Sequence, residues 1–173
     1  MTGAGFVTGG GITVRVARDD ELEAAGEVVA EAYRPMPGMG EDPGYLEHVR
    51  DARGRATEVD VLVAVDEDGT ILGCASFVRD HASRFAEVER PDEAGIRMVG
   101  VAPAARRRGV ARALVEACAD RARASGKRGI AILTEPRWTG SHRVYERLGF
   151  HRAPDRDWEP EPGFILWAWV LDL

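Results

Sequence analysis

Residues 96–125 decide the fold of this chain, and they read IRMVGVAPAARRRGVARALVEACADRARAS. The first of them form a short apolar run that ends at Pro103, as is typical of a buried strand. After a turn rich in arginine, the apolar residues recur at helical spacing on one face, namely Val110, Ala113, Leu114, Ala117, Cys118 and Ala122. The stretch therefore predicts a strand, a basic turn and an amphipathic helix in direct succession.

The basic turn combines three arginines with a glycine: Arg106, Arg107, Arg108 and Gly109. The first turn of the following helix leaves N–H groups without intrahelical partners, and the helix dipole adds positive charge there. Gly109 and Ala111 allow a ligand to approach the backbone closely, and the arginines can neutralise a phosphate. The pattern indicates a phosphate site, although a solvated basic helix start in an ordinary βα unit explains it equally well.

Similar patterns predict the other elements. Expected strands cover residues 12–16, 59–65, 71–78, 129–133 and 164–171, with a further strand from Phe150. Expected helices are one capped by Asp19 or Asp20 and ended before Pro35, and two more at residues 45–52 and 140–148. Residues 66–69 predict a hairpin turn, whereas residues 81–93 and the Pro-rich residues 156–163 are expected to be loops. These elements indicate an α/β domain around a mixed sheet.

Length and composition limit the class of protein. The 173 residues suit one domain, for which we expect a flexible tail at residues 1–11 and a folded domain at residues 12–173. An apolar fraction of 45% and a charged fraction of 30% describe a soluble globular protein. The net charge of −6 argues against a nucleic-acid partner, so the basic turn is better explained as a local phosphate site.

Several further expectations concern setting and assembly. Cys74 and Cys118 lie in apolar stretches and are expected to be buried free thiols, which fits a reducing, cytoplasmic location. No Cys/His cluster has metal-ligand spacing, and the longest apolar run, residues 164–171, is too short to span a membrane. That long final strand suggests a homodimer formed through strand edges, and a fully internal strand is the alternative.

Two motifs carry a family resemblance. The pattern V-x-P-x-x-R-R-R-G-V-A resembles the acyl-CoA signature of the GCN5-related N-acetyltransferase (GNAT) family, whose core R/Q-x-x-G-x-G/A corresponds to Arg106, Gly109 and Ala111. Residues 141–150, SHRVYERLGF, resemble the second family signature, in which a loop leads to a tyrosine, here Tyr145, and then to Gly-Phe. The two motifs stand in the family's order, with a helix and a strand between them.

The resemblance implies a specific fold and reaction. The fold is a single α/β domain in which a mixed, mostly antiparallel sheet is flanked by helices and its two central strands splay apart around acyl-CoA. The reaction is direct transfer of an acetyl group from acetyl-CoA to a primary amine of a small molecule or peptide, without an acyl-enzyme and without a metal. The implied cofactor-binding residues are Val99, Val101, Arg106, Arg107, Arg108, Gly109, Val110, Ala111, Arg112, Ser141 and Tyr145.

Three of these residues have implied chemical roles. Tyr145 matches the family's general acid, which protonates the departing CoA sulfur, and a phenol is protonated at neutral pH as an acid must be. Packing of an aromatic ring beside Val144 and Leu148 is the alternative. The backbone N–H of Val99 or Val101 would polarise the thioester carbonyl in the manner of an oxyanion donor.

The chain departs from the family pattern at two positions. Trp138 stands where many members have asparagine, and Ser141 offers a replacement hydroxyl. Gly95 falls where a subgroup carries a glutamate base, so Glu93 is named as the candidate base. Glu87 and Glu89 also precede the central strand, and Glu41 and Asp42 lie in the loop expected to border the acceptor site. All four are more typical of solvated surface groups. The departures support an alternative function, a catalytically weak or inactive acyl-CoA-binding sensor, against which Tyr145 weighs.

Overall fold

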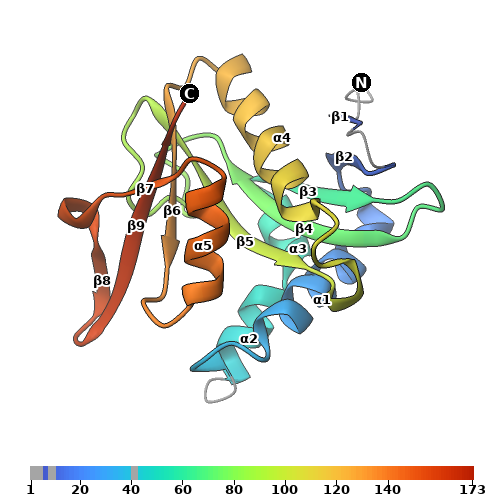
Figure 1. Cartoon of the computed structure of the whole chain (residues 1–173), viewed down its shortest axis with the longest axis horizontal. Coiled ribbons are helices and arrows are strands. Elements are labelled where there is room, and N and C mark those ends of the chain that lie inside the picture. The colour runs from blue at the N-terminus through green and yellow to red at the C-terminus, as the bar shows by residue number, and fades with distance from the viewer. Residues whose placement is uncertain (1–5, 8–10, 40–42) are drawn as a thin grey trace. The chain divides into compact units, whose positions relative to one another are not determined.

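The computed structural model describes residues 6–7, 11–39 and 43–173 of the chain. The chain divides into two compact units, one containing residues up to 77 together with residues 98–118, the other containing residues 78–97 and 119–173. Strand β5 (Glu93–Val101) and helix α4 (Val110–Ala124) each contribute residues to both units (Figure 1). Within the described residues, no helix combines the length and the apolar character needed to cross a membrane.

The first unit contains a run of antiparallel strands. Its order is β1 (Phe6–Val7), β2 (Thr13–Val16), β3 (Asp60–Val65) and β4 (Ile71–Val78), followed by the end of β5. The Asp66 carboxylate closes the β3–β4 turn by accepting hydrogen bonds from the N–H groups of Asp68 (3.1 Å) and Thr70 (2.9 Å). Gly69 in this turn has a φ of +82°, which glycine adopts without strain. The predicted hairpin is confirmed.

Three helices of the first unit pack closely because glycines leave room for them. They are α1 (Leu22–Tyr33), α2 (Pro43–Arg50) and α3 (Ala52–Ala56). A Cβ atom on Gly26 in α1 would overlap the carbonyl oxygen of Arg50 at the end of α2. A Cβ atom on Gly100 in β5 would lie 2.7 Å from the Cα atom of Val29 in α1. Helix α1 is therefore held directly against both α2 and β5.

The second unit is organised around the last strand, β9 (Phe164–Asp172). Strand β6 (Gly129–Thr134) pairs antiparallel with β9, and β7 (His151–Arg152) and β8 (Trp158–Glu161) pair antiparallel with it as well. The start of β5 pairs in parallel with β6 over residues 93–95. The sheet is therefore mixed and mostly antiparallel, and with its flanking helices it confirms the predicted α/β fold class.

The two faces of β9 carry different packing. Ala153, Ala168 and Val170 form a buried cluster against which Val88 and Leu133 pack, so the connection that follows β4 covers this face. Trp167 and Trp169 alternate with these residues along β9 and therefore point to the opposite face. There the ring of His142, in helix α5 (Thr139–Arg147), lies 5.2 Å from each tryptophan ring, measured between centroids.

Two strands lie where the sequence predicts none. Strand β8 falls within the segment predicted as a Pro-rich loop, because pairing with β9 supplies partners for its backbone groups. Strand β1 falls within the predicted N-terminal tail, where Phe6 is opposite Val14 and Val7 is opposite Thr13. Residues 1–5 and 8–10 of that tail lie outside the described part of the chain.

The predicted cap of the first helix is wrong. Neither Asp19 nor Asp20 caps α1, because a short 3-10 turn, η1 (Asp19–Glu21), precedes it. Instead the Glu21 carboxylate accepts a hydrogen bond of 2.8 Å from the N–H of Arg18. The helix predicted at residues 45–52 is likewise found as two helices, α2 and α3.

Candidate functional site

A short basic loop joins β5 to α4 in the first unit. It begins with a 3-10 turn, η3 (Pro103–Ala105), and continues through Arg106, Arg107 and Arg108, whose side chains are exposed. Arg107 and Gly109 have positive φ angles of 65° and 83°, so the chain turns sharply just before the helix. A Cβ atom on Gly109 would meet no other atom within 4 Å, which leaves the backbone open to a ligand.

The start of α4 presents backbone donors beside this loop. The first intrahelical hydrogen bond runs from the N–H of Ala113 to the carbonyl of Gly109, at 2.9 Å. The N–H groups of Val110, Ala111 and Arg112 precede that bond and so have no carbonyl acceptor within the helix. Together with the helix dipole and the three arginines, these donors match the oxygens of a diphosphate. The predicted phosphate-binding residues therefore fit the nucleotide end of acetyl-CoA.

The buried face of α4 fixes the position of these donors. Val110 and Leu114 are 1% and 0% exposed, and a Cβ atom on Gly73 in β4 would lie 2.7 Å from the Val110 side chain. Arg112, by contrast, is on the exposed side of the helix, where its Nε donates to the Glu116 carboxylate at 2.7 Å. Such an exposed pair contributes little, so the Arg112 guanidinium is free to exchange Glu116 for a phosphate.

The end of β5 is irregular where the family resemblance places the acetyl group. Met98 has a φ of +52°, a conformation rare for a residue of this type, at a cost of about 1–3 kcal/mol. Val99 and Val101, which follow it, are half-buried. The strand then joins β4 through a 2.9 Å hydrogen bond from the N–H of Ala102 to the carbonyl of Leu72. The role of the Val99 and Val101 backbone remains a prediction.

Tyr145 occupies a buried position on α5 in the second unit. It is 8% exposed, and its ring meets the edge of the Phe150 ring at a centroid distance of 5.5 Å. The N–H of Phe150 donates to the carbonyl of Tyr145 at 3.0 Å, and Gly149 reverses the chain between them with a φ of +93°. Ser141, one turn earlier, is half-buried. Packing of Tyr145 is thus observed, and its role as general acid remains a prediction.

A stack of rings that the sequence did not predict supports α5. The Arg152 guanidinium lies 4.7 Å from the centroid of Trp167 and donates to both carboxylate oxygens of Asp157, at 2.8 and 2.9 Å. His142 stacks on Trp167 at 5.2 Å, and burial lowers the pKa of His142 below its ordinary value. A neutral imidazole therefore packs on the tryptophan and holds the helix that carries Tyr145.

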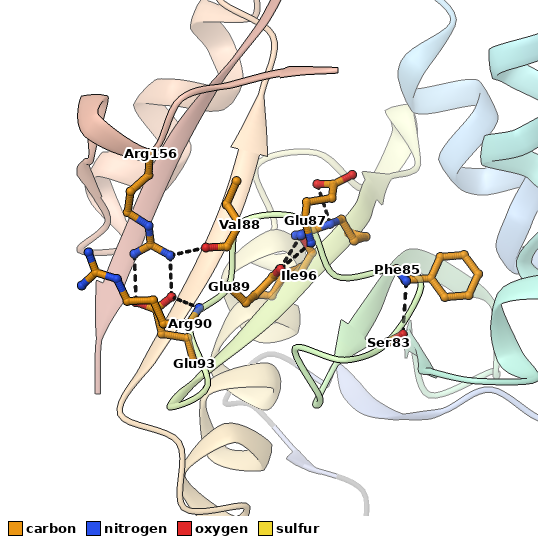
Figure 2. A network of polar contacts seen from close by, with 10 residues as sticks. Ser83, Phe85, Glu87, Val88, Glu89, Arg90, Glu93, Ile96 and Arg156 are labelled. Carbon is orange, nitrogen blue, oxygen red and sulfur yellow. Dashed lines mark hydrogen bonds and ion pairs between the residues drawn. The ribbon is translucent and has the colours of Figure 1, made fainter. Parts of the chain in front are cut away.

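Glu93, the predicted base, forms an ion pair with Arg156. Its two oxygens accept hydrogen bonds from the Arg156 guanidinium, at 2.9 and 2.5 Å, and one also accepts the N–H of Arg90 at 2.9 Å (Figure 2). Burial favours a higher pKa for Glu93, but the hydrogen bonds from Arg156 and Arg90 outweigh it and lower the pKa. A carboxylate stabilised in this way is a poor proton acceptor, so the geometry does not support the predicted role of Glu93.

Two other carboxylates lie around a buried arginine: Glu87 is exposed, as expected, whereas the Glu89 side chain is buried. Arg97 in β5 is 8% exposed and pairs with both Glu87 and Glu89 (Figure 2). Sequence reasoning missed this cluster because Arg97 interrupts an otherwise apolar strand without a visible partner. The other two carboxylates expected near the acceptor, Glu41 and Asp42, lie outside the described residues.

The remaining predicted features can be compared directly. Cys74 and Cys118 are buried free thiols, as predicted, and burial raises the pKa of Cys74 to about 12.

Trp138 is 9% exposed, and its carbonyl accepts the N–H groups of Ser141 and His142 at 2.9 and 3.2 Å, so this residue begins α5. Among the described residues there is no group of three or more His, Cys, Asp or Glu side chains placed to hold a metal ion.

Comparison with known proteins identifies the family. The model of the acetyltransferase (GNAT) family matches residues 25–150, which is more than half of the chain. The chain therefore belongs to the GNAT acetyltransferase family, whose members use acetyl-CoA. None of the curated protein sequences matches it.

Solved structures show the same fold. A GCN5-related N-acetyltransferase from Kribbella flavida is 25% identical, with a TM-score of 0.62 over 94% of this chain and 98% of that one. A GNAT-family acetyltransferase from Staphylococcus aureus Mu50 is 12% identical, with a TM-score of 0.70 over 94% and 99%. The PaiA N-acetyltransferase from Thermoplasma acidophilum, solved in complex with coenzyme A, is 14% identical, with a TM-score of 0.69 over 94% and 99%.

Proposed function

We propose that the chain is an acetyl-CoA-dependent N-acetyltransferase that transfers the acetyl group directly to a primary amine of a small molecule or peptide. The observation that carries this proposal is the loop before α4, where three exposed arginines, an open glycine and the first-turn N–H groups converge. Family membership and the Kribbella flavida N-acetyltransferase, at 25% identity, support the same chemistry. A cytoplasmic location accompanies the proposal as an expectation.

The residues of this chain divide the work of the reaction. The loop and the start of α4 would bind the diphosphate and so position the thioester, which lowers the entropic cost of the transfer. A backbone N–H of Val99 or Val101 would polarise the carbonyl, and Tyr145 would donate a proton to the departing sulfur. Bound acetyl-CoA supplies the activated acetyl group.

The binding part of the proposal is tested by titration calorimetry with acetyl-CoA. Replacing Arg106, Arg107 and Arg108 together by alanine is expected to weaken binding roughly 10- to 100-fold, or about 1.4–2.8 kcal/mol in total, because the three exposed arginines are screened by water and the backbone N–H donors of α4 remain. The matched control is Arg123→Ala, near the other end of α4, where the arginine makes only an exposed pair with Asp120. Equal binding by the wild type, the triple variant and the control would contradict the assignment of this loop.

The catalytic part is tested by release of free CoA in the presence of a panel of primary amines. We expect transfer to at least one amine, and a loss of about 100-fold in kcat for Tyr145→Phe that is larger than the accompanying loss of acetyl-CoA affinity. Tight binding of acetyl-CoA without transfer to any amine would favour the sensor, the alternative function that Gly95 and Trp138 suggest.

A further inference from the structure

Helix α5 is attached to the sheet of the second unit through few buried side chains (Figure 1). Of its nine residues, only His142 and Tyr145 are buried. A helix this short is not stable by itself in water, so its position depends on these contacts. The ring of His142 supplies the contact with β9, where it stacks on Trp167 at a centroid distance of 5.2 Å and an interplanar angle of 25°. Loss of this contact is therefore expected to loosen α5.

The hydrogen bond of His142 fixes which ring nitrogen can take up a proton. Its Nε2 lies 3.2 Å from the backbone carbonyl oxygen of Glu135. A carbonyl oxygen only accepts hydrogen bonds, so Nε2 carries the hydrogen and Nδ1 is the basic nitrogen of the neutral ring. Protonation at Nδ1 would leave this hydrogen bond in place but would add a positive charge to the ring.

A cation already lies on the tryptophan rings that His142 contacts. The Arg152 guanidinium, in β7, is 4.7 Å from the centroid of Trp167 and 5.6 Å from that of Trp169. Asp157 holds it there by accepting hydrogen bonds of 2.8 and 2.9 Å. The His142 ring and this guanidinium contact the same Trp167 ring and so lie within about 10 Å of each other, where two positive charges repel. A tryptophan ring attracts cations, but Arg152 already makes that interaction here.

The surroundings of His142 oppose its protonated form. Burial has the largest effect and lowers the pKa of His142 below its ordinary value of 6.5, the hydrogen bond to Glu135 acts in the opposite direction, and the charge of Arg152 lowers the pKa further. The carboxylates of Glu146 and Glu135 attract a proton to the ring. Glu146 is exposed, however, and Glu135 is already paired with Arg137 at 2.7 Å. The folded chain therefore favours the neutral ring.

We propose that His142 is a pH-sensitive switch that controls the attachment of helix α5 to β9. The neutral ring stacks on Trp167 and holds the helix against the strand. The ring protonated at Nδ1 is a second cation beside Arg152 in a buried position, and the helix then separates from the strand. The tryptophans of β9 stay in place, because Nε1 of Trp169 donates to the hydroxyl of Thr134 in β6 at 2.9 Å.

The separation is expected as the pH falls below 6.5. Because the folded chain lowers the pKa of His142, the ring takes up a proton more readily once α5 is released. The contribution of His142 to holding α5 is therefore complete above the ordinary value of 6.5 and is lost as the pH falls toward the lowered value. At pH 5.5 a free histidine is protonated by about ten to one, so the released population rises by at most about tenfold relative to pH 7.5.

The test is hydrogen exchange of the full chain at pH 7.5 and 5.5, followed by mass spectrometry, with each rate divided by the intrinsic exchange rate at that pH. In the wild type we expect the protection of the α5 amides to fall about two- to tenfold on acidification, while that of β6 and β9 changes by less than about twofold. His142→Phe keeps a ring for stacking but takes up no proton, so its α5 protection is expected to be the same at both pH values. The matched control is His151→Phe, at an exposed histidine of β7, which is expected to respond as the wild type does.

Three outcomes overturn the inference. They are a wild-type α5 whose protection changes by less than twofold, a fall in His142→Phe equal to that of the wild type, and a fall shared equally by β6 and β9, which would mean that the unit unfolds as a whole. If His142→Phe does not fold, His142→Gln decides, because its amide can donate to the Glu135 carbonyl but takes up no proton. Protection independent of pH in that variant supports the inference, and a fall like that of the wild type overturns it. The measurement uses neither acetyl-CoA nor an amine, so its result is independent of the proposed reaction.

Discussion

Glu21 shows what a single buried carboxylate does at the start of a helix. It accepts two hydrogen bonds of 2.7 Å from the Arg15 guanidinium and one of 2.8 Å from the N–H of Arg18. The hydrogen bonds from Arg15, assisted by Arg18, lower the pKa of Glu21 to about 2 even though burial acts in the opposite direction. The charged form of this residue is therefore part of the folded structure.

We expect Glu21→Gln to destabilise the chain by about 1–3 kcal/mol at pH 7, where the carboxylate would be ionised in both the folded and unfolded states. Because the folded-state pKa is depressed, the stabilisation is complete above the ordinary value of 4.5 and is lost as the pH falls toward 2. Urea unfolding at several pH values checks this. The difference from the wild type should shrink across that window, and a difference that persists at pH 2 would contradict the account. Glu23→Gln, at an exposed position, serves as the control.

At the same scale, the sequence allowed some site residues to be predicted and concealed others. Arg106, Gly109 and Ala111 were predicted because backbone geometry at a helix start depends only on neighbours in the chain. The ion pair of Glu93 with Arg156 joins residues that are 63 positions apart, and no local pattern reveals such a partner. Glu89 was predicted to be a surface carboxylate for the same reason, but its side chain is buried against Arg97 in the folded chain.

At the scale of elements, α1 depends on a close approach to the end of α2. Gly26→Ala places a methyl group against the carbonyl oxygen of Arg50, so we expect a loss of several kcal/mol in stability despite the better helix propensity of alanine. The matched control is Gly140→Ala in α5, where a Cβ atom would meet nothing within 4 Å, and where we expect no change or a gain of up to about 1 kcal/mol. Thermal unfolding measures both variants, and an equal response would contradict the packing of α1 on α2.

Elements with a strong internal pattern were predicted well, and elements that depend on a partner were not. The apolar stripe of α4 and the DEDG turn between β3 and β4 each identify their element from local sequence alone. Strand β8 reads WEPE and is exposed along its whole length, so it has neither alternation nor a buried face to reveal it. It is a strand only because β9 lies beside it.

At the scale of the whole molecule, the structure removes the strand edge on which the homodimer prediction relied. The prediction assumed that the last strand offers a free edge, but β9 lies between β6 and β7 in the sheet and is internal. Dimerisation remains a prediction that would have to use side chains instead of this strand edge. Sedimentation equilibrium at micromolar concentration checks it, and a mass equal to one chain at every concentration would contradict it.

The ion pair of Glu93 with Arg156 also constrains how this protein can diverge. Each side chain is about nine-tenths buried, so loss of either one strands an opposite charge in the interior at a cost of about 3–5 kcal/mol. That is a large share of the stability of an ordinary domain. A sequence that replaces both residues one at a time must therefore pass through a less stable intermediate protein, or must first acquire a substitution that compensates for the lost stability. We therefore expect the residues at positions 93 and 156 to change together among related proteins.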